Sequence, residues 1–221
     1  MATLALCFAL PSQATALSVL DFNLTVPNTG VIDYATAGGT LKGSGIEIAN
    51  VVSIQSPSHQ GETLSCVNCI LSFETGVLNS YIPGPVIDTW IFEEGSSTHL
   101  TIEGSIPASG SISPPDLMHA VFSTQIFVVR RFVTGFTVQI GIYEGEAEDN
   151  LASYFGESGT EIEQGGMNIS FHAPSVATDG TFTSSTLYSG NLTANVVPEP
   201  GTELLLLVGL AGLGYAGRRE K

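Results

Sequence analysis

Short runs in which apolar and polar residues alternate constrain this chain more than any other feature of its sequence. From Leu20 to Val26 every second residue is apolar, and the alternation recurs from Phe136 to Ile142 and from Met167 to Phe171. Because strand side chains point to opposite faces in turn, a period of two predicts strands that bury one face. The expected strands cover residues 20–26, 46–54, 70–76, 87–93, 99–103, 120–129, 136–142, 167–172 and 182–192.

Glycine and proline clusters separate these runs, for example at residues 83–85, 165–166 and 179–180. Such clusters mark tight turns, so neighbouring runs are expected to be antiparallel. About ten short strands at this spacing predict an all-β chain folded as an antiparallel β-sandwich. The sequence has no strand–helix–strand rhythm, which excludes a Rossmann-type fold.

The distribution of charge excludes one class of function and marks the C-terminal end. The chain has 6 Lys and Arg against 21 Asp and Glu, a formal net charge of −15. Proteins that bind nucleic acid by neutralising phosphates need the opposite balance, so this class is excluded. Half of the positive charge falls in the last four positions, at Arg218, Arg219 and Lys221.

The last 25 residues have the pattern of a membrane segment with a stiff approach. Pro198 and Pro200 keep the chain extended, and Leu204–Gly217 is an uncharged run rich in Leu and Gly. As a helix this run would rise about 21 Å, or about 25 Å if counted from Gly201, near the lower limit for a bilayer core of ~30 Å. The basic residues that follow place that end in the cytoplasm. A single C-terminal transmembrane helix is therefore predicted.

The sequence Val197-Pro198-Glu199-Pro200, followed by a short Gly-rich apolar helix and a terminal Arg cluster, resembles the PEP-CTERM sorting signal of exported bacterial proteins. The resemblance implies that the protein is a substrate of an exosortase, a membrane-embedded cysteine enzyme that processes near the Pro-Glu-Pro motif. It also implies an inner-membrane intermediate and then a location at the cell surface or outside the cell, associated with exopolysaccharide and biofilm.

The first 16 residues resemble a secretory signal peptide. An apolar stretch from Met1 to Leu10 is followed by Pro11 and by Ala14 and Ala16, which fit the A-x-A pattern of a cleavage site. No Lys or Arg precedes the apolar stretch, so we expect a start upstream of Met1 and a truncated signal. The expected organisation is a signal peptide at 1–16, a β-sandwich ectodomain at 17–196 and the sorting signal at 197–221.

Cys66 and Cys69 form the single C-x-x-C pair of the sequence. A zinc site needs a second pair or histidines at suitable spacing, and a thioredoxin-like site needs an α/β fold. Neither pattern is present, and in an exported chain the pair predicts a disulfide across a small loop. Cys7 would leave with the signal peptide.

An acidic run from Glu144 to Asp149 has two interpretations. Carboxylates at alternate positions can bind Ca²⁺, but Asp149 stands where an EF-hand loop starting at Glu144 requires Gly. The other interpretation is the solvated start of a short helix at Glu146–Phe155, where acidic residues favour the positive end of the helix dipole. We expect the helix start and keep calcium binding as an alternative.

The sequence contains no G-x-S-x-G, H-E-x-x-H or phosphate-binding loop. Asp116 and His119 are close enough in sequence to form a catalytic pair, although the preceding Pro114-Pro115 predicts a loop there. Trp90 and Tyr81 flank a Pro-Gly-Pro turn and are either a platform for stacking sugars or part of the core.

These observations predict an exported protein of the cell surface or extracellular matrix, with a structural or adhesive role, no catalysis and no cofactor. Its expected partners are an exosortase, the membrane through the C-terminal helix, and exopolysaccharide. A carbohydrate- or calcium-binding surface module is the alternative. A secreted hydrolase, with a pocket that joins a histidine, an acid and a nucleophile, is a third hypothesis.

Overall fold

The computed structural model describes residues 17–56, 58–110, 116–131, 134–156 and 160–196. Its strands are β1 (Leu17–Leu24), β2 (Val31–Tyr34), β3 (Thr40–Ser53), β4 (Thr63–Ile82), β5 (Ile87–Phe92), β6 (His99–Ser105), β7 (Asp116–Phe122), β8 (Ile126–Arg131), β9 (Gly135–Ala147), β10 (Glu161–His172), β11 (Phe182–Thr183) and β12 (Thr186–Val196). The helical elements are the α-helix α1 (Asp149–Tyr154) and the 3₁₀ turn η1 (Pro107–Ser109).

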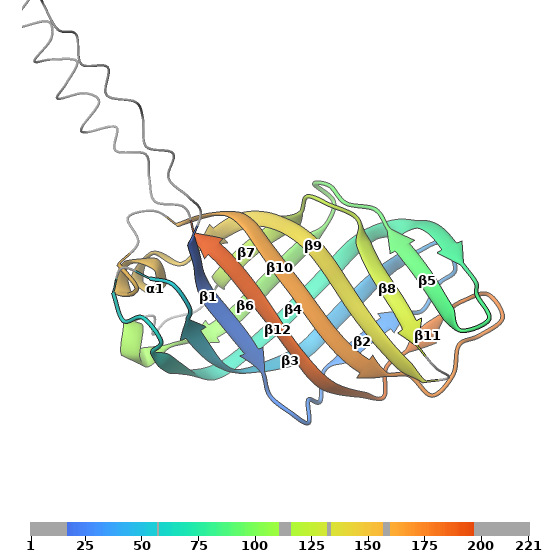
Figure 1. The fold of residues 1–221 in the computed structure, drawn as a ribbon, viewed down its shortest axis with the longest axis horizontal. Coiled ribbons are helices and arrows are strands. Elements are labelled where there is room, and N and C mark those ends of the chain that lie inside the picture. The colour runs from blue at the N-terminus through green and yellow to red at the C-terminus, as the bar shows by residue number, and fades with distance from the viewer. Residues whose placement is uncertain (1–16, 57, 111–115, 132–133, 157–159, 197–221) are drawn as a thin grey trace, which may run out of the picture. The chain divides into compact units, whose positions relative to one another are not determined.

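All described strands belong to one antiparallel sheet, in the order β11-β2-β3-β1-β12-β10-β9-β7-β6-β4-β5-β8. Additional pairings of β3 with β4 and of β9 with β8 close the sheet on itself. Figure 1 shows the two resulting layers, with β12, β10 and β9 in front and β6 and β4 behind. The prediction of an antiparallel all-β fold with one short helix is confirmed, but the strands form one continuous sheet and not the two separate sheets of a β-sandwich.

Long, bent strands explain why the sheet is continuous. β4 has 20 residues and β3 has 14, and their pairing has register shifts, for example between Gly43 and Ile46. Such irregularities bend a strand and increase its twist. β4 therefore pairs along one edge with β6 through residues 67–74 and then with β5 through residues 78–82.

Most expected strands are present with different limits, two expected runs are each divided, and one strand was not expected. The run expected at 120–129 is divided into β7 and β8 by a turn, in which the Thr124 hydroxyl accepts a hydrogen bond of 3.0 Å from the Ile142 amide. The run at 182–192 is likewise divided into β11 and β12, and β2 was not expected at all. Short side-chain contacts that interrupt pairing are invisible to a period-two pattern.

The helix is shorter than the predicted Glu146–Phe155, because β9 continues through Ala147. Glu146 pairs with Glu161 of β10, and Ala147 pairs with Met118 of β7, so two neighbouring strands hold this backbone extended. The Glu148 carboxylate then accepts a hydrogen bond of 2.9 Å from the Leu151 amide, which makes it the N-cap of α1.

The interior of the sheet is filled by apolar and aromatic side chains. Rings of Trp90, Phe136, Phe171 and Phe182 come from four different strands, and their contacting centroids lie 5.0–5.8 Å apart. At this end the Trp90 indole donates a hydrogen bond of 3.0 Å to the Gly180 carbonyl, which holds the loop before β11 against the core. α1 lies at the opposite end of the sheet in Figure 1, and its Leu151 is buried.

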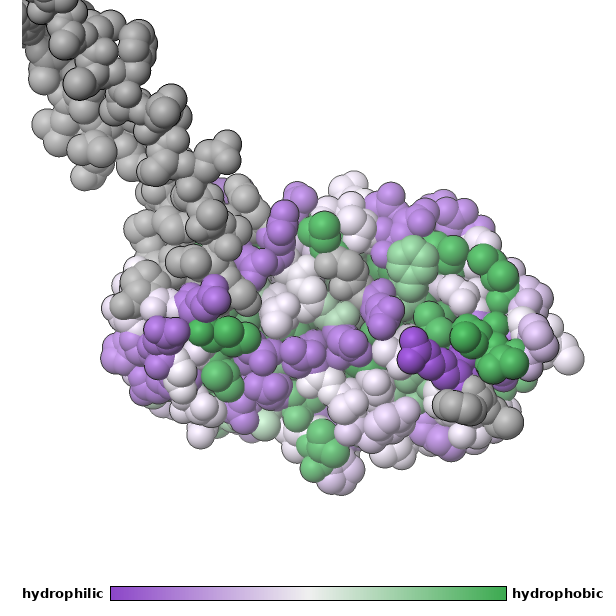
Figure 2. Space-filling view, in the orientation of Figure 1, coloured by the Kyte–Doolittle hydropathy of each residue, from purple (hydrophilic) through white to green (hydrophobic). Residues whose placement is uncertain are grey.

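A hydrophobic area lies on the outside of the sheet near β5 and β8. Ile82, Val86, Ile87 and Phe127 are exposed there, and Figure 2 shows this area in green beside largely hydrophilic surface. No helix among the described residues is long and apolar enough to cross a membrane. The predicted transmembrane helix and signal peptide lie outside the described residues.

Gly165 of β10 makes room for the largest buried side chain of β9. A Cβ atom at this position would lie 1.8 Å from Cζ of Tyr143. The Tyr143 hydroxyl donates a hydrogen bond of 2.6 Å to the Thr193 carbonyl of β12, so the ring is fixed across β10. Burial, and to a smaller extent the charge of Asp21, raises the pKa of Tyr143 well above its ordinary value.

We expect Gly165→Ala to lower the free energy of unfolding by about 3 kcal/mol, because the added methyl group overlaps the Tyr143 ring. Urea unfolding followed by tryptophan fluorescence measures the change. Ser170→Ala, on the half-buried outer face of the same strand, should stay within about 0.5 kcal/mol of the wild type. A gain in stability from Gly165→Ala would contradict the close approach.

Candidate functional site

The first and last described strands meet at one point of the sheet. Leu17 is directly paired with Val196, and Val196 is also paired with Ile162 of β10. The Val196 side chain is fully buried. Strand β12 is therefore held along both edges up to the residue that precedes the predicted sorting motif.

The residues predicted for sorting and cleavage lie outside the described residues. These are the motif Val197, Pro198, Glu199 and Pro200, the terminal charges Arg218, Arg219 and Lys221, and the signal-cleavage residues Ala14 and Ala16. The structure does describe the two residues that flank this set, Leu17 and Val196.

Cys66 and Cys69 lie in β4, and the structure joins their sulfur atoms in a disulfide. The two Cα atoms are 5.6 Å apart, and Asn68 between them has a positive φ of 54°. Asn tolerates this left-handed conformation better than most residues. The register of β4 with β6 shifts between Val67 and Ile70, so the bridge spans a local bulge at the edge of this pairing.

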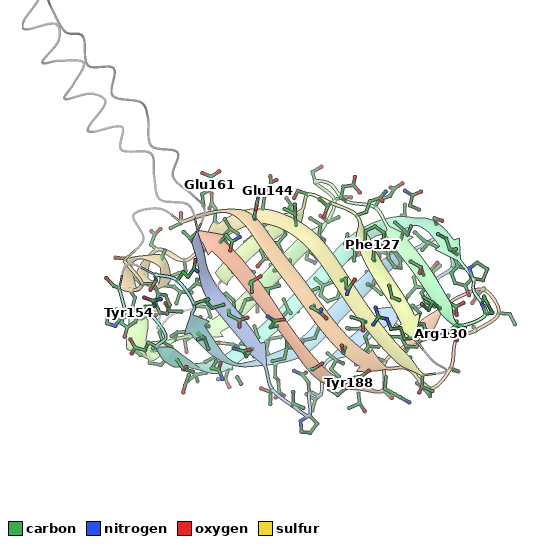
Figure 3. All side chains as sticks on the ribbon, viewed as in Figure 1. Phe127, Arg130, Glu144, Tyr154, Glu161 and Tyr188 are labelled. Atoms are coloured by element: carbon green, nitrogen blue, oxygen red, sulfur yellow. A yellow bond between two sulfur atoms is a disulfide. The ribbon has the colours of Figure 1, made fainter. Side chains whose placement is uncertain are left out.

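The acidic run does not converge on one point. Glu144 and Glu146 are exposed on β9, and Figure 3 shows Glu144 and Glu161 extending outward along one rim of the sheet. Glu148 caps α1 as described above. Among the described residues there is no group of three or more His, Cys, Asp and Glu side chains that could hold a metal ion.

The histidines make separate contacts. His59 Nδ1 lies 2.6 Å from Glu62 Oε2, and its ring stacks on Tyr154 with centroids 4.2 Å apart. His172 Nδ1 lies 2.9 Å from Ser185 Oγ. His119 lies on β7 opposite Glu146, and Asp116 and His119 are both exposed on this strand. The loop predicted at Pro114-Pro115 lies outside the described residues.

A sugar-stacking platform at Trp90 and Tyr81 is wrong. Trp90 has no exposed surface, and Tyr81 stacks on it with ring centroids 4.9 Å apart. Trp90 therefore belongs to the core, which was the other interpretation, and Tyr81 is partly buried against it. Burial, with a smaller contribution from Asp88, raises the pKa of Tyr81.

A buried ion pair, which the sequence did not reveal, supports the turn next to these aromatic residues. Asp88 is 3% exposed, and its carboxylate contacts the Arg130 guanidinium of β8. The other Asp88 oxygen accepts a hydrogen bond of 2.9 Å from the Gly84 amide. Asp88 and Arg130 are directly paired across β5 and β8, so the ion pair follows from strand register.

A shallow depression of about 300 Å³ lies beside the turn from β2 to β3. Two of its lining residues contact Glu74: Lys42 Nζ lies 2.9 Å from Glu74 Oε1, and the Thr40 hydroxyl donates to the same oxygen at 2.8 Å. The hydrogen bonds from Lys42 and Thr40 lower the pKa of Glu74. The depression is lined by Asp33, Ala35, Thr36, Gly39, Thr40 and Lys42.

Comparison with protein families finds a known motif that starts at the last residue of β12. A family model described as the PEP-CTERM protein-sorting motif matches residues 196–220. The chain carries a PEP-CTERM sorting motif. No curated protein matches the chain, and no solved structure matches it either.

The PEP-CTERM motif indicates a processing partner and a route. It implies an exosortase as the processing enzyme, export, and membrane-associated sorting toward the cell surface. The match begins at Val196, the buried last residue of β12. Ordered sheet therefore extends to the first position of the PEP-CTERM match.

We expect Arg130→Met to lower the free energy of unfolding by about 3–5 kcal/mol, because it leaves the buried Asp88 carboxylate without its counter-charge. Arg131→Met is the matched control, since Arg131 is the exposed neighbour, and its effect should stay within about 0.5 kcal/mol. Urea unfolding measures both variants. Equal effects of the two substitutions would contradict the importance of the ion pair.

We expect Lys42→Met to lower the free energy of unfolding by less than about 1 kcal/mol at pH 7, because the pair with Glu74 is partly exposed. The pKa of Glu74 is lowered in the folded state, so its stabilisation is present above the unfolded value of about 4.3 and disappears as the pH falls through the folded pKa. Unfolding curves from pH 7 down to about pH 3 should therefore converge for the two proteins. A difference that widens in acid would have the wrong sign.

Proposed function

We propose that this protein is an exported component of the cell surface or extracellular matrix, sorted and processed by an exosortase, with a structural or adhesive role. The observation that carries the proposal is the PEP-CTERM motif at residues 196–220. In this proposal the protein is not an enzyme and needs no cofactor. The β-sheet domain is the part delivered, and the C-terminal residues are the part that the sorting machinery uses.

The physical logic of sorting follows from the sequence around the motif. Pro198 and Pro200 lack amide donors and keep the preceding residues extended, so this stretch is a poor candidate to continue a helix or a sheet. The apolar run and the basic terminus after it fit a helix that holds the substrate in the bilayer with its end in the cytoplasm. β12, paired on both edges, provides a firm boundary before this segment.

The hydrolase hypothesis requires a histidine that meets both an acid and a nucleophile. In the part of the chain that the structure describes, His59 contacts the carboxylate of Glu62, and His172 contacts the hydroxyl group of Ser185. These contacts involve different histidines on different elements. This separation favours the non-catalytic proposal.

Replacing Pro198, Glu199 and Pro200 together by Ala should block exosortase processing, because the extended motif is lost. We expect the full-length chain to accumulate in the membrane fraction of the native host, whereas the wild type is recovered as a shorter product. Mass spectrometry of the two fractions measures this. Thr202→Ala, outside the Pro-Glu-Pro motif, is the control and should be processed normally.

Deletion of residues 197–221 gives a second and independent result. Without the membrane segment the domain should be exported and released without retention, and this is measured by comparing membrane, surface and medium fractions. Unchanged processing and localisation after this deletion would refute the sorting part of the proposal.

A further inference from the structure

Five amide side chains form one row across the outer face of the sheet. Successive pairs in the strand register join Asn50 of β3 to Asn23 of β1, Asn23 to Asn191 of β12, Asn191 to Asn168 of β10, and Asn168 to Gln139 of β9. We call this set the amide row. Because neighbouring strands lie 4.7–4.9 Å apart, it extends over about 19 Å, perpendicular to the strands.

The central part of the amide row lies on the layer that faces the viewer in Figure 1, where β12, β10 and β9 are side by side. Asn168 and Gln139 are exposed, whereas Asn23, Asn50 and Asn191 are half-buried. Each of its five side chains has some exposed surface, and none of them lines the depression beside the β2–β3 turn. The shape of the row therefore fits an extended ligand better than a compact one.

Local structure does not account for the whole row. Asn23 donates a hydrogen bond of 3.1 Å to Asn50, and Asn191 donates one of 3.0 Å to Asp21, so these residues stabilise their neighbours. Within the described residues, the side chains of Asn168 and Gln139 have no hydrogen-bond partner. Asn is disfavoured in strands, so an exposed Asn in the middle of a sheet lowers the stability of the fold unless its side chain makes a compensating contact. Departures from local preference of this kind are typical of functional surfaces.

Two features extend the chemistry of the row. The next residue in register after Gln139 is Phe127 of β8, which is 39% exposed and is labelled in Figure 3. A second row of hydroxyl groups runs parallel to the first, through Ser189, Ser170 and Thr137. This hydroxyl row is displaced by two residues, about 6.8 Å along the strands. Together they provide neutral donors and acceptors next to an aromatic ring.

Charge narrows the class of ligand. The chain has a net charge of −15. The Asp21 carboxylate, which accepts a hydrogen bond from Asn191, adds negative charge next to the amide row. A polyanion would be repelled, whereas an amide can both donate to and accept from an uncharged hydroxyl group. The apolar face of a sugar ring can pack against an exposed aromatic side chain. A row of separated weak contacts gains affinity when one long ligand makes all of them.

We infer that the amide row binds a neutral polysaccharide chain, which lies across β1, β12, β10 and β9 with one sugar ring against Phe127. This inference deepens the proposed adhesive role and rests on it. It names the class of ligand and the surface, and it distinguishes an uncharged polymer from an acidic one.

Native affinity electrophoresis of the full chain in a mild detergent tests the inference. The gels contain hydroxyethyl cellulose, dextran or alginate. We expect at least one of the two neutral polymers to retard the protein and alginate not to retard it. The double variant Asn168→Val and Gln139→Val should raise the apparent Kd by about tenfold, because the hydrogen bonds of two residues are lost. Val favours strands, so this variant should keep the fold.

A matched control uses one Asn and one Gln from paired positions outside the row. Asn195 of β12 is paired with Gln164 of β10, and the double variant Asn195→Val and Gln164→Val should bind as the wild type does. Phe127→Ala should weaken binding independently, because it removes the ring and leaves the amides.

Three results would overturn the inference: no retardation by either neutral polymer, retardation by alginate alone, or equal binding by the wild type and the Asn168/Gln139 variant. The amide row could instead be a contact between two copies of the chain, and sedimentation of the wild type and this variant tests that explanation. If the wild type self-associates and the variant does not, the row belongs to such a contact and the inference is wrong. These binding results do not depend on sorting. If the sorting tests fail and polysaccharide binding is intact, only the proposed function is refuted. If sorting is as expected and binding is absent, only this inference is refuted.

Discussion

The pairings of β3 with β4 and of β9 with β8 give this sheet an inside, and the other features of the structure depend on them. Without these two ladders the described strands would form an open sheet with two long edges and an uncovered apolar face. With them, the rings of Trp90, Phe136, Phe171 and Phe182, which come from four strands, pack against one another in the interior. The strand at the remaining end of the order, β11, has only two residues, which limits edge-to-edge association.

The direct pairing of β1 with β12 brings the two ends of the described domain together. β1 and β12 are neighbours in the closed sheet and run antiparallel, so Leu17 and Val196 are paired at the same end. The start of the described domain and the first residue of the PEP-CTERM match therefore lie side by side. The rest of the surface, including the face of β12, β10 and β9, is left available for contacts outside the cell.

Burial explains which residue types occupy the interior of the sheet, but it does not explain those on the outer face. Interior positions follow from burial, since Trp90, Phe136 and Phe171 have almost no exposed surface. Among the outer positions, Arg130 is explained by the buried carboxylate that it neutralises. Asn168 and Gln139 have no such structural explanation among the described residues, and interaction with a ligand would explain why amides occupy them.

The sequence by itself determined the features that depend on neighbouring residues. Period-two runs located most strands, turn residues separated them, and the Pro-Glu-Pro motif with its apolar run identified the sorting signal. Only the tertiary structure decided which strands are paired, that Trp90 is core, that Asp88 meets Arg130, and that five amides share one row. These contacts join residues far apart in the chain, and their register depends on bulges and on the packing of the whole interior, which no local pattern contains.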